Sequence, residues 1–85
     1  MHGFKFLVFM DKGIIKEKQI AGDVVTAIVE TPDGEMRKIF ASLTSVVSCH
    51  VFAELDEVEV GAKIEFLTLG EGDEEGEELI HIILL

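Results

Sequence analysis

The residues best suited to chemistry are one cysteine and three histidines, and two of these, Cys49 and His50, are neighbours. A catalytic thiol needs a base within hydrogen-bonding distance, and a zinc site needs several sulfur or nitrogen ligands. In the extended chain that we predict here, neighbouring side chains point to opposite faces, so the pair forms no dyad. Neither His2 nor His81 completes a CxxC or HxxxH spacing. We expect Cys49 to be a small buried thiol, with no catalytic or metal-binding residue among these four.

The second chemical candidate is the glycine-rich acidic segment, residues 70–78. It contains six carboxylates: Glu71, Asp73, Glu74, Glu75, Glu77 and Glu78. Because calcium and magnesium take several oxygen ligands at close range, cation binding is one interpretation. The EF-hand spacing is absent, since that loop requires acids at alternate positions, a sixth glycine and a twelfth glutamate. We favour the other interpretation, a solvated loop that attracts basic partners.

Motifs of the common enzyme classes are missing from the chain. It contains no nucleophile elbow, P-loop, dinucleotide-binding fingerprint or HExxH sequence. Tryptophan and tyrosine are also absent, which leaves few aromatic side chains with a polar end for binding a small ligand. We therefore expect no enzymatic activity from this chain and no cofactor.

The charge of the chain is concentrated in its second half. Seven basic and 17 acidic residues give a net charge of −10. Residues 1–50 hold six of each and are neutral, whereas in residues 51–85 Lys63 is the one base against eleven acids. Such a field repels phosphate backbones and favours basic protein partners, so we expect nucleic acid not to bind.

The length of 85 residues, with 48% hydrophobic side chains, predicts a single small domain over residues 1–85. One cysteine excludes an internal disulfide and is typical of a reducing compartment, so we expect a cytoplasmic protein. The apolar run Phe4–Met10 contains Lys5 and is too short for a signal-peptide core or a membrane helix.

Runs of β-branched and aromatic residues predict five strands, over residues 4–10, 24–30, 36–40, 64–69 and 79–84. The best local pattern is the hairpin around Thr31-Pro32-Asp33-Gly34, since proline and glycine supply the backbone angles of a turn.

Three other segments are harder to assign. Asp11-Lys12-Gly13 predicts a turn, and residues 14–20 an exposed edge strand or an irregular crossing. Over residues 42–48 we expect a short helix or helical turn begun by Ser42, followed by extended chain through Val51.

Apolar residues occupy both faces of several predicted strands, whereas a sheet with one wet face shows polar residues at alternate positions. In the strand 64–69, Ile64 and Phe66 take one face and Leu67 and Leu69 the other. The strand 24–30 divides in the same way, with Val25, Ala27 and Val29 opposite Val24 and Ile28.

Two interpretations of these faces carry equal weight. A closed barrel tolerates scattered apolar residues on its outside. Alternatively, the outer face is buried against another subunit, and the interface then contains Leu7, Phe9, Leu67, Leu69 and Ile83.

Three short segments resemble the cold-shock type of OB barrel. The run Val60-Gly61-Ala62-Lys63-Ile64-Glu65-Phe66 is similar to the entry to that family's fourth strand. Asp11-Lys12-Gly13 resembles the turn after its first strand, and Ile39–Leu43 its third strand and following turn. The resemblance covers about a quarter of the chain and implies an OB-like barrel. Where the family stacks bases on aromatic side chains, this chain has Ile14, Ile15 and Leu43, so the resemblance does not extend to nucleic-acid binding.

We thus predict a mainly β fold, a small five- or six-stranded antiparallel barrel or rolled sheet, OB-like or SH3-like, with at most one short helix. The predicted function is a non-enzymatic protein-interaction module or assembly subunit that self-associates or binds another protein with a basic surface. The alternatives are an OB-like domain for single-stranded nucleic acid and a regulatory domain that binds a divalent cation.

Overall fold

In the computed structural model, which describes residues 10–70 and 72–85, the hairpin predicted around residues 31–34 is present. Strand β2 (Val24–Glu30) pairs antiparallel with β3 (Met36–Ser42), from Val24 opposite Ser42 to Glu30 opposite Met36. The turn is closed by a hydrogen bond of 2.9 Å from the Gly34 amide to the Thr31 carbonyl. Gly34 has φ of 88°, a backbone angle that side chains with a Cβ rarely adopt.

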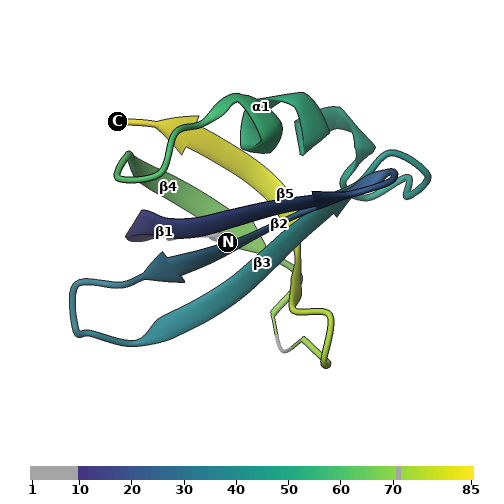
Figure 1. The fold of residues 1–85 in the computed structure, drawn as a ribbon. Coiled ribbons are helices and arrows are strands. Elements are labelled where there is room, and N and C mark those ends of the chain that lie inside the picture. The colour runs from purple at the N-terminus through teal and green to yellow at the C-terminus, as the bar shows by residue number, and fades with distance from the viewer. Residues whose placement is uncertain (1–9, 71) are drawn as a thin grey trace, which may run out of the picture.

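Three further strands, β1 (Asp11–Ala21), β4 (Lys63–Thr68) and β5 (Glu77–Leu84), complete a closed barrel in the order β1-β2-β3-β5-β4 (Figure 1). The predicted small five-stranded β-barrel is therefore confirmed, and it is consistent with an OB-like barrel. The pairings are antiparallel except that of β3 with β5, which is parallel and aligns two residue pairs, Ile39 with Glu77 and Phe40 with Glu78. We call this short pairing the β3–β5 seam. Parallel neighbours need a long crossover, which here contains the helix and β4.

Alternation along the strands builds the core as predicted. Val25, Ala27 and Val29 of β2 and Ile64 and Phe66 of β4 are at most 1% exposed. Ile15, Ile39, Ala41 and Leu79 join them from the other strands. Because the strands surround one cluster, each contributes one face to the core and turns the other outward.

The structure corrects our interpretation of residues 11–20. Asp11-Lys12-Gly13 is not a turn, because these residues begin β1, which pairs with both β2 and β4 and is not an edge strand. The register shifts between Ile15 and Glu17, so that Lys16 forms a bulge. A bulge reverses the alternation of side chains, which explains the mixed pattern that we had assigned to an edge or a crossing.

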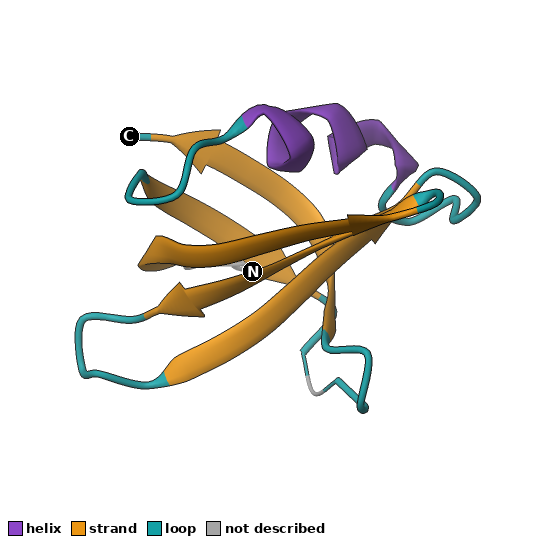
Figure 2. Cartoon of the chain, viewed as in Figure 1, coloured by secondary structure: helices purple, strands orange, loops and turns teal. Residues whose placement is uncertain are grey.

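The helix lies later in the chain than predicted. Residues 43–48 form turns, the first closed by a hydrogen bond of 3.2 Å from the Ser45 amide to the Ser42 carbonyl, so a turn rather than a helix begins at Ser42. Cys49–Val51 form a 3₁₀ turn and Phe52–Glu57 form α1, so the predicted extended chain through Val51 was wrong. The physical reason is the spacing of Val51, Leu55 and Val58, which places three apolar side chains on one helical face. All three are at most 7% exposed, and α1 covers one end of the barrel (Figure 2).

Two of the three segments with a family resemblance lie in the expected elements. Gly61, with φ of 96°, forms the turn that leads into β4, and Ile39–Ser42 lie in β3. The third, Asp11-Lys12-Gly13, does not follow a first strand but starts one. Of the predicted strand 4–10, residues 4–9 lie outside the described residues. None of the helices described is long and apolar enough to span a bilayer.

Candidate functional site

Arg37 joins four strands at the barrel end away from α1. It stands opposite Val29, a core residue, and its guanidinium carbon lies 5.0 Å from the centre of the buried Phe66 ring. It donates two hydrogen bonds to Glu77 of β5, of 3.0 and 2.6 Å, and one of 2.8 Å to Asp11 of β1. Thr68 of β4 donates to the same Glu77 carboxylate at 2.8 Å. Bidentate, charge-assisted bonds of this kind fix both partners, so the cluster closes the barrel end.

The two partners of this pair shift one another's protonation. The hydrogen bonds from Arg37 lower the pKa of Glu77 against the opposing effect of burial, and the hydrogen bond from Thr68 adds a smaller lowering. The hydrogen bonds to Glu77 raise the pKa of Arg37 in turn. Both groups are therefore charged and occupied with each other, which suits a structural role better than a catalytic one.

Glu78, the next residue of β5, is held by the turns that follow β3. Its carboxylate accepts hydrogen bonds from the hydroxyls of Ser45 and Ser48, the latter at 2.8 Å. The Ser48 hydroxyl is fully buried and also accepts a hydrogen bond of 2.9 Å from the Ser42 amide. Two of the six predicted loop carboxylates, Glu77 and Glu78, thus belong to β5 and are bound within the protein.

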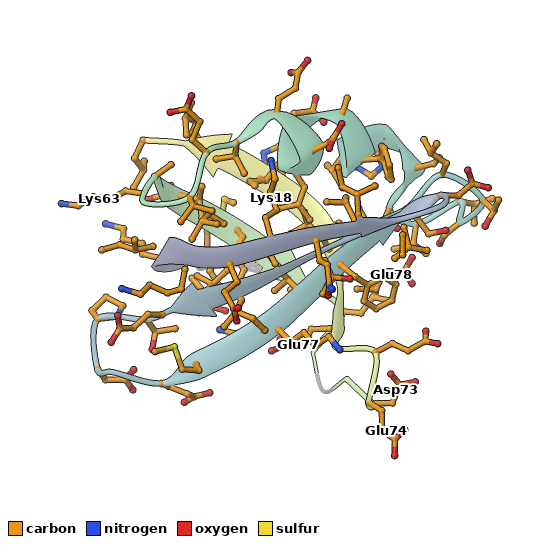
Figure 3. The ribbon with its side chains drawn as sticks, in the orientation of Figure 1. Lys18, Lys63, Asp73, Glu74, Glu77 and Glu78 are labelled. Atoms are coloured by element: carbon orange, nitrogen blue, oxygen red, sulfur yellow. The ribbon has the colours of Figure 1, made fainter. Side chains whose placement is uncertain are left out.

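The rest of the acidic segment projects from the barrel, with Asp73 and Glu74 at its tip (Figure 3). Asp73 accepts a hydrogen bond of 2.8 Å from the Glu75 amide, and Lys38 of β3 donates one of 3.0 Å to the Glu74 carbonyl. Glu71 lies outside the described residues. Within residues 10–70 and 72–85, no group of three or more His, Cys, Asp or Glu side chains is arranged to hold a metal ion.

A groove between α1 and the β4–β5 pair combines an apolar floor with carboxylates. This α1 groove has a volume of about 180 Å³ and is lined by Glu54, Glu57, Val58, Ile64, Ile82 and Leu84. Glu54 and Glu57 stand three positions apart and so share one face of the helix. Among the described residues, neither glutamate has a salt-bridge partner. The apolar side chain of Leu84, at the edge of the groove, is 65% exposed. The groove therefore offers both apolar contact and uncompensated negative charge.

Lys18 secures the helix from the barrel side. Its ammonium donates hydrogen bonds to the carbonyls of Asp56 and, at 2.7 Å, of Val58, at the C-terminal end of α1 (Figure 3). These carbonyls carry the negative end of the helix dipole, where a cation is favourable. The helix is only six residues long, too short to be stable alone, so this contact and the core face fix its position.

The predicted interface residues are only partly brought together. Leu67 of β4 pairs with His81 of β5, and Ile83 lies two residues further along the same outer face. Ile83 is 40% exposed, and Leu69, just beyond the end of β4, is 61% exposed. Leu7 and Phe9 lie outside the described residues. The interface itself stays a prediction.

Cys49 is exposed in the 3₁₀ turn, so its predicted burial was wrong. The adjacent His50 places its Nε2 atom 2.8 Å from the Ile80 carbonyl and is engaged in tying the turn to β5. His81 is exposed on the outer face of the barrel.

Sequence reasoning did not find several of the residues described above. No motif in the sequence points to Arg37, Lys18 or Ser48, because each forms its hydrogen bonds with a partner 30 to 40 residues away in the chain. Glu54 and Glu57 were counted in the acidic half, but their relation to an apolar groove depends on the position of α1. The spacing of Val51, Leu55 and Val58 is the signal that could have placed them on a helix.

We compared the chain with protein-family models, with curated proteins and with solved structures. No family model matches the sequence, and no curated protein or solved structure matches at a significant level.

Proposed function

We propose that this chain is a non-enzymatic protein-interaction module that binds a partner with a basic surface. The observation that carries the proposal is the α1 groove, where Glu54 and Glu57 flank an apolar floor. A lysine or arginine side chain has matching chemistry, because its aliphatic stem packs on apolar surface while its cation meets a carboxylate. The net charge of −10 adds a long-range field that speeds the approach of a basic partner.

The partners of three lysines outside the groove favour a protein over a nucleic acid. In a nucleic-acid complex, lysines on the barrel strands would bind the phosphates. Lys16, however, pairs with Glu30, and Lys38 binds the acidic segment. The ammonium of Lys18 is directed to the α1 carbonyls. If single-stranded DNA or RNA nevertheless shifts the protein in a gel at low salt, the nucleic-acid alternative replaces this proposal.

The test uses a fluorescein-labelled peptide of alternating lysine and leucine as the probe, and fluorescence anisotropy with the full chain. The double variant Glu54→Gln/Glu57→Gln removes the two groove carboxylates. The matched control, Glu17→Gln/Glu59→Gln, removes two exposed carboxylates that do not line the groove. Both change the net charge equally, so they separate a local site from a general field.

We expect the groove variant to bind about two- to thirtyfold more weakly than the control, as two ion pairs of about 0.2–1 kcal/mol each would give. Equal weakening by both variants would mean that the peptide responds to net charge alone and that the groove is not the site. The absence of any binding at low salt would remove the basic partner altogether.

A further inference from the structure

A second hollow of the described barrel lies over β1, β4 and the turn between β2 and β3, and it shares Ile64 with the α1 groove. It has a volume of about 460 Å³, and its side-chain walls are Lys12, Ile14, Glu30, Pro32, Lys63, Ile64 and Leu85. We call it the lysine pocket. Its size is within the range of roughly 300–1,000 Å³ that is typical of small-molecule sites.

The register of β1 and β4 places both lysines on one side of the sheet. Lys12 is opposite Glu65, and Ile14 is opposite Lys63. Because side chains alternate with a period of two, Lys12, Ile14 and Lys63 share a face, with the two lysines as diagonal neighbours. Ile14 therefore stands between Lys63 on β4 and Glu30 on β2, with Lys12 on the same face.

Positive charge at the lysine pocket is unusual for this protein. Lys12 is 3.7 Å from Glu65, a loose pairing, and Lys16 stands 3.5 Å from Glu30. Lys63 has no salt-bridge partner in the part of the chain that the structure describes. Its side chain points away from the barrel, on the far side from Asp73 and Glu74 (Figure 3). Among the lining residues, Lys12 and Lys63 are basic and Glu30, which pairs with Lys16, is acidic, so the pocket keeps a local positive charge on a chain that is acidic overall.

The opposite wall is held rigidly. Thr31 and Glu35 are joined by a hydrogen bond of 2.9 Å from the Thr31 amide to the Glu35 carbonyl, and the Thr31 hydroxyl bonds to Asp33. Pro32 between them has a fixed φ. A wall that is already ordered loses little entropy when a ligand binds against it.

We propose that the lysine pocket binds an aliphatic carboxylic acid, with its hydrocarbon chain against Ile14, Pro32 and Leu85 and its carboxylate between Lys12 and Lys63. A single negative charge on an apolar body fits two point charges above an apolar wall. A polyanion, such as a nucleic acid, gains less apolar contact and meets the repulsion of the −10 field. The ligand class differs from the basic partner proposed for the α1 groove, and the two hollows share only Ile64 among their lining residues.

Octanoate and octan-1-ol serve as probes, titrated into the ¹⁵N-labelled full chain and followed by NMR. Octanol has the same chain without the charge, so it separates the contribution of the lysines from that of the apolar wall. We expect octanoate to shift the amides of Ile14, Ile64 and Leu85, and to bind more tightly than octanol.

Two variants make the test specific. Lys63→Gln should weaken octanoate binding about two- to fivefold, as an exposed charge pair of about 0.2–1 kcal/mol implies, and leave octanol binding unchanged. Lys38→Gln removes an equal charge on β3, away from the pocket, and should bind octanoate as the wild type does. Shifts that avoid these amides, equal affinity for octanol, or equal weakening by Lys38→Gln would each overturn the proposal.

Discussion

Arg37 on β3 holds Glu77 on β5 through two parallel hydrogen bonds, 3.0 Å from Nε to Oε2 and 2.6 Å from Nη2 to Oε1. The backbone of Glu77 pairs with Ile39 in the same place, at the β3–β5 seam. Because this seam aligns only two residue pairs, the side-chain bonds reinforce the barrel where backbone pairing is shortest. Both side chains are 17% exposed, so water screens them only in part.

The first prediction concerns the acid stability of Glu77. Arg37 lowers the pKa of Glu77 below its ordinary value of 4.5, so folding favours the ionised form. The pair is therefore fully stabilising above the unfolded pKa, and its contribution is lost as pH falls through the lower folded pKa. In Glu77→Gln, the free energy of unfolding should fall less steeply than in the wild type between about pH 5 and pH 3.

Urea unfolding at a series of pH values measures this difference. Glu75→Gln, in the acidic segment, is the matched control and should retain the wild-type pH profile. If Glu77→Gln and the wild type lose stability in parallel on acidification, Glu77 is not the group responsible.

The second prediction concerns Ser48, whose fully buried hydroxyl bonds to the Ser42 amide and the Glu78 carboxylate. Ser48→Ala leaves a buried amide and a carboxylate without this partner, which costs about 1–3 kcal/mol. Thr44→Ala, at an exposed neighbouring position, should cost less than about 1 kcal/mol. Urea unfolding compares the two, and equal costs would count against the role of Ser48.

The third prediction tests the contact of Lys18 with α1. Lys18→Met keeps the aliphatic stem but removes both bonds to the helix carbonyls, so we expect a loss of about 1–3 kcal/mol in unfolding free energy. Amide hydrogen exchange within α1 should accelerate beyond that of the strands, because the helix depends on this contact. Lys16→Met, at the bulge, is the control. Unchanged exchange in α1 would show that its core face alone holds it.

The fourth prediction concerns the close approach of β1 and β2 at Gly13. A Cβ added at Gly13 would lie 2.2 Å from the Val29 Cγ1 atom and 2.9 Å from the Glu30 carbonyl oxygen. Gly13→Ala should therefore destabilise the barrel by about 1–3 kcal/mol. In a Val29→Ala background the first clash is gone, so the cost should shrink, and a double-mutant cycle measures the coupling. If the free-energy costs of the two substitutions simply add, contact with the Val29 side chain is not the cause of the destabilisation.

The fifth prediction concerns self-association through the outer β4–β5 face. With Leu69 61% and Ile83 40% exposed, we expect sedimentation at micromolar concentration to show a dimer or larger species. Ile83→Glu should shift the population toward the monomer. Val46→Glu, at a loop position that is 93% exposed, should not. A wild type that sediments as a clean monomer would remove the predicted interface.

Local patterns explain which parts of the fold were predictable. The Thr31–Gly34 turn and the alternation in β2 and β4 depend on neighbouring residues, and both were found in the sequence. The bulge at Lys16 disguised β1, because one inserted residue reverses the alternation on which the assignment of strands depends. The helix was misplaced because β-branched residues around Ser42 obscured the three-residue and four-residue spacing that begins at Val51.

The candidate site was harder to predict from the sequence than the fold, and for a different reason. Its acidic character follows from composition. Composition does not show which carboxylates are bound within the protein and which project from it. Glu77 and Glu78 look like Asp73 and Glu74 in the sequence, yet only the first two have side-chain carboxylates bonded to β3 and to the turns after it. Lysine pairs such as Lys12 and Lys63 come together only through the β1–β4 register, which no local pattern specifies.

The β3–β5 seam also bears on the order of folding. Strands β1, β2 and β3 can form from contacts between successive segments, whereas Arg37 and Glu77 are 40 residues apart in the chain. The entropy of closing so long a segment delays their meeting until the intervening helix and β4 are in place. We expect closure of the seam to follow the rate-limiting step, so substitutions at Arg37 or Glu77 should accelerate unfolding and leave the refolding rate nearly unchanged.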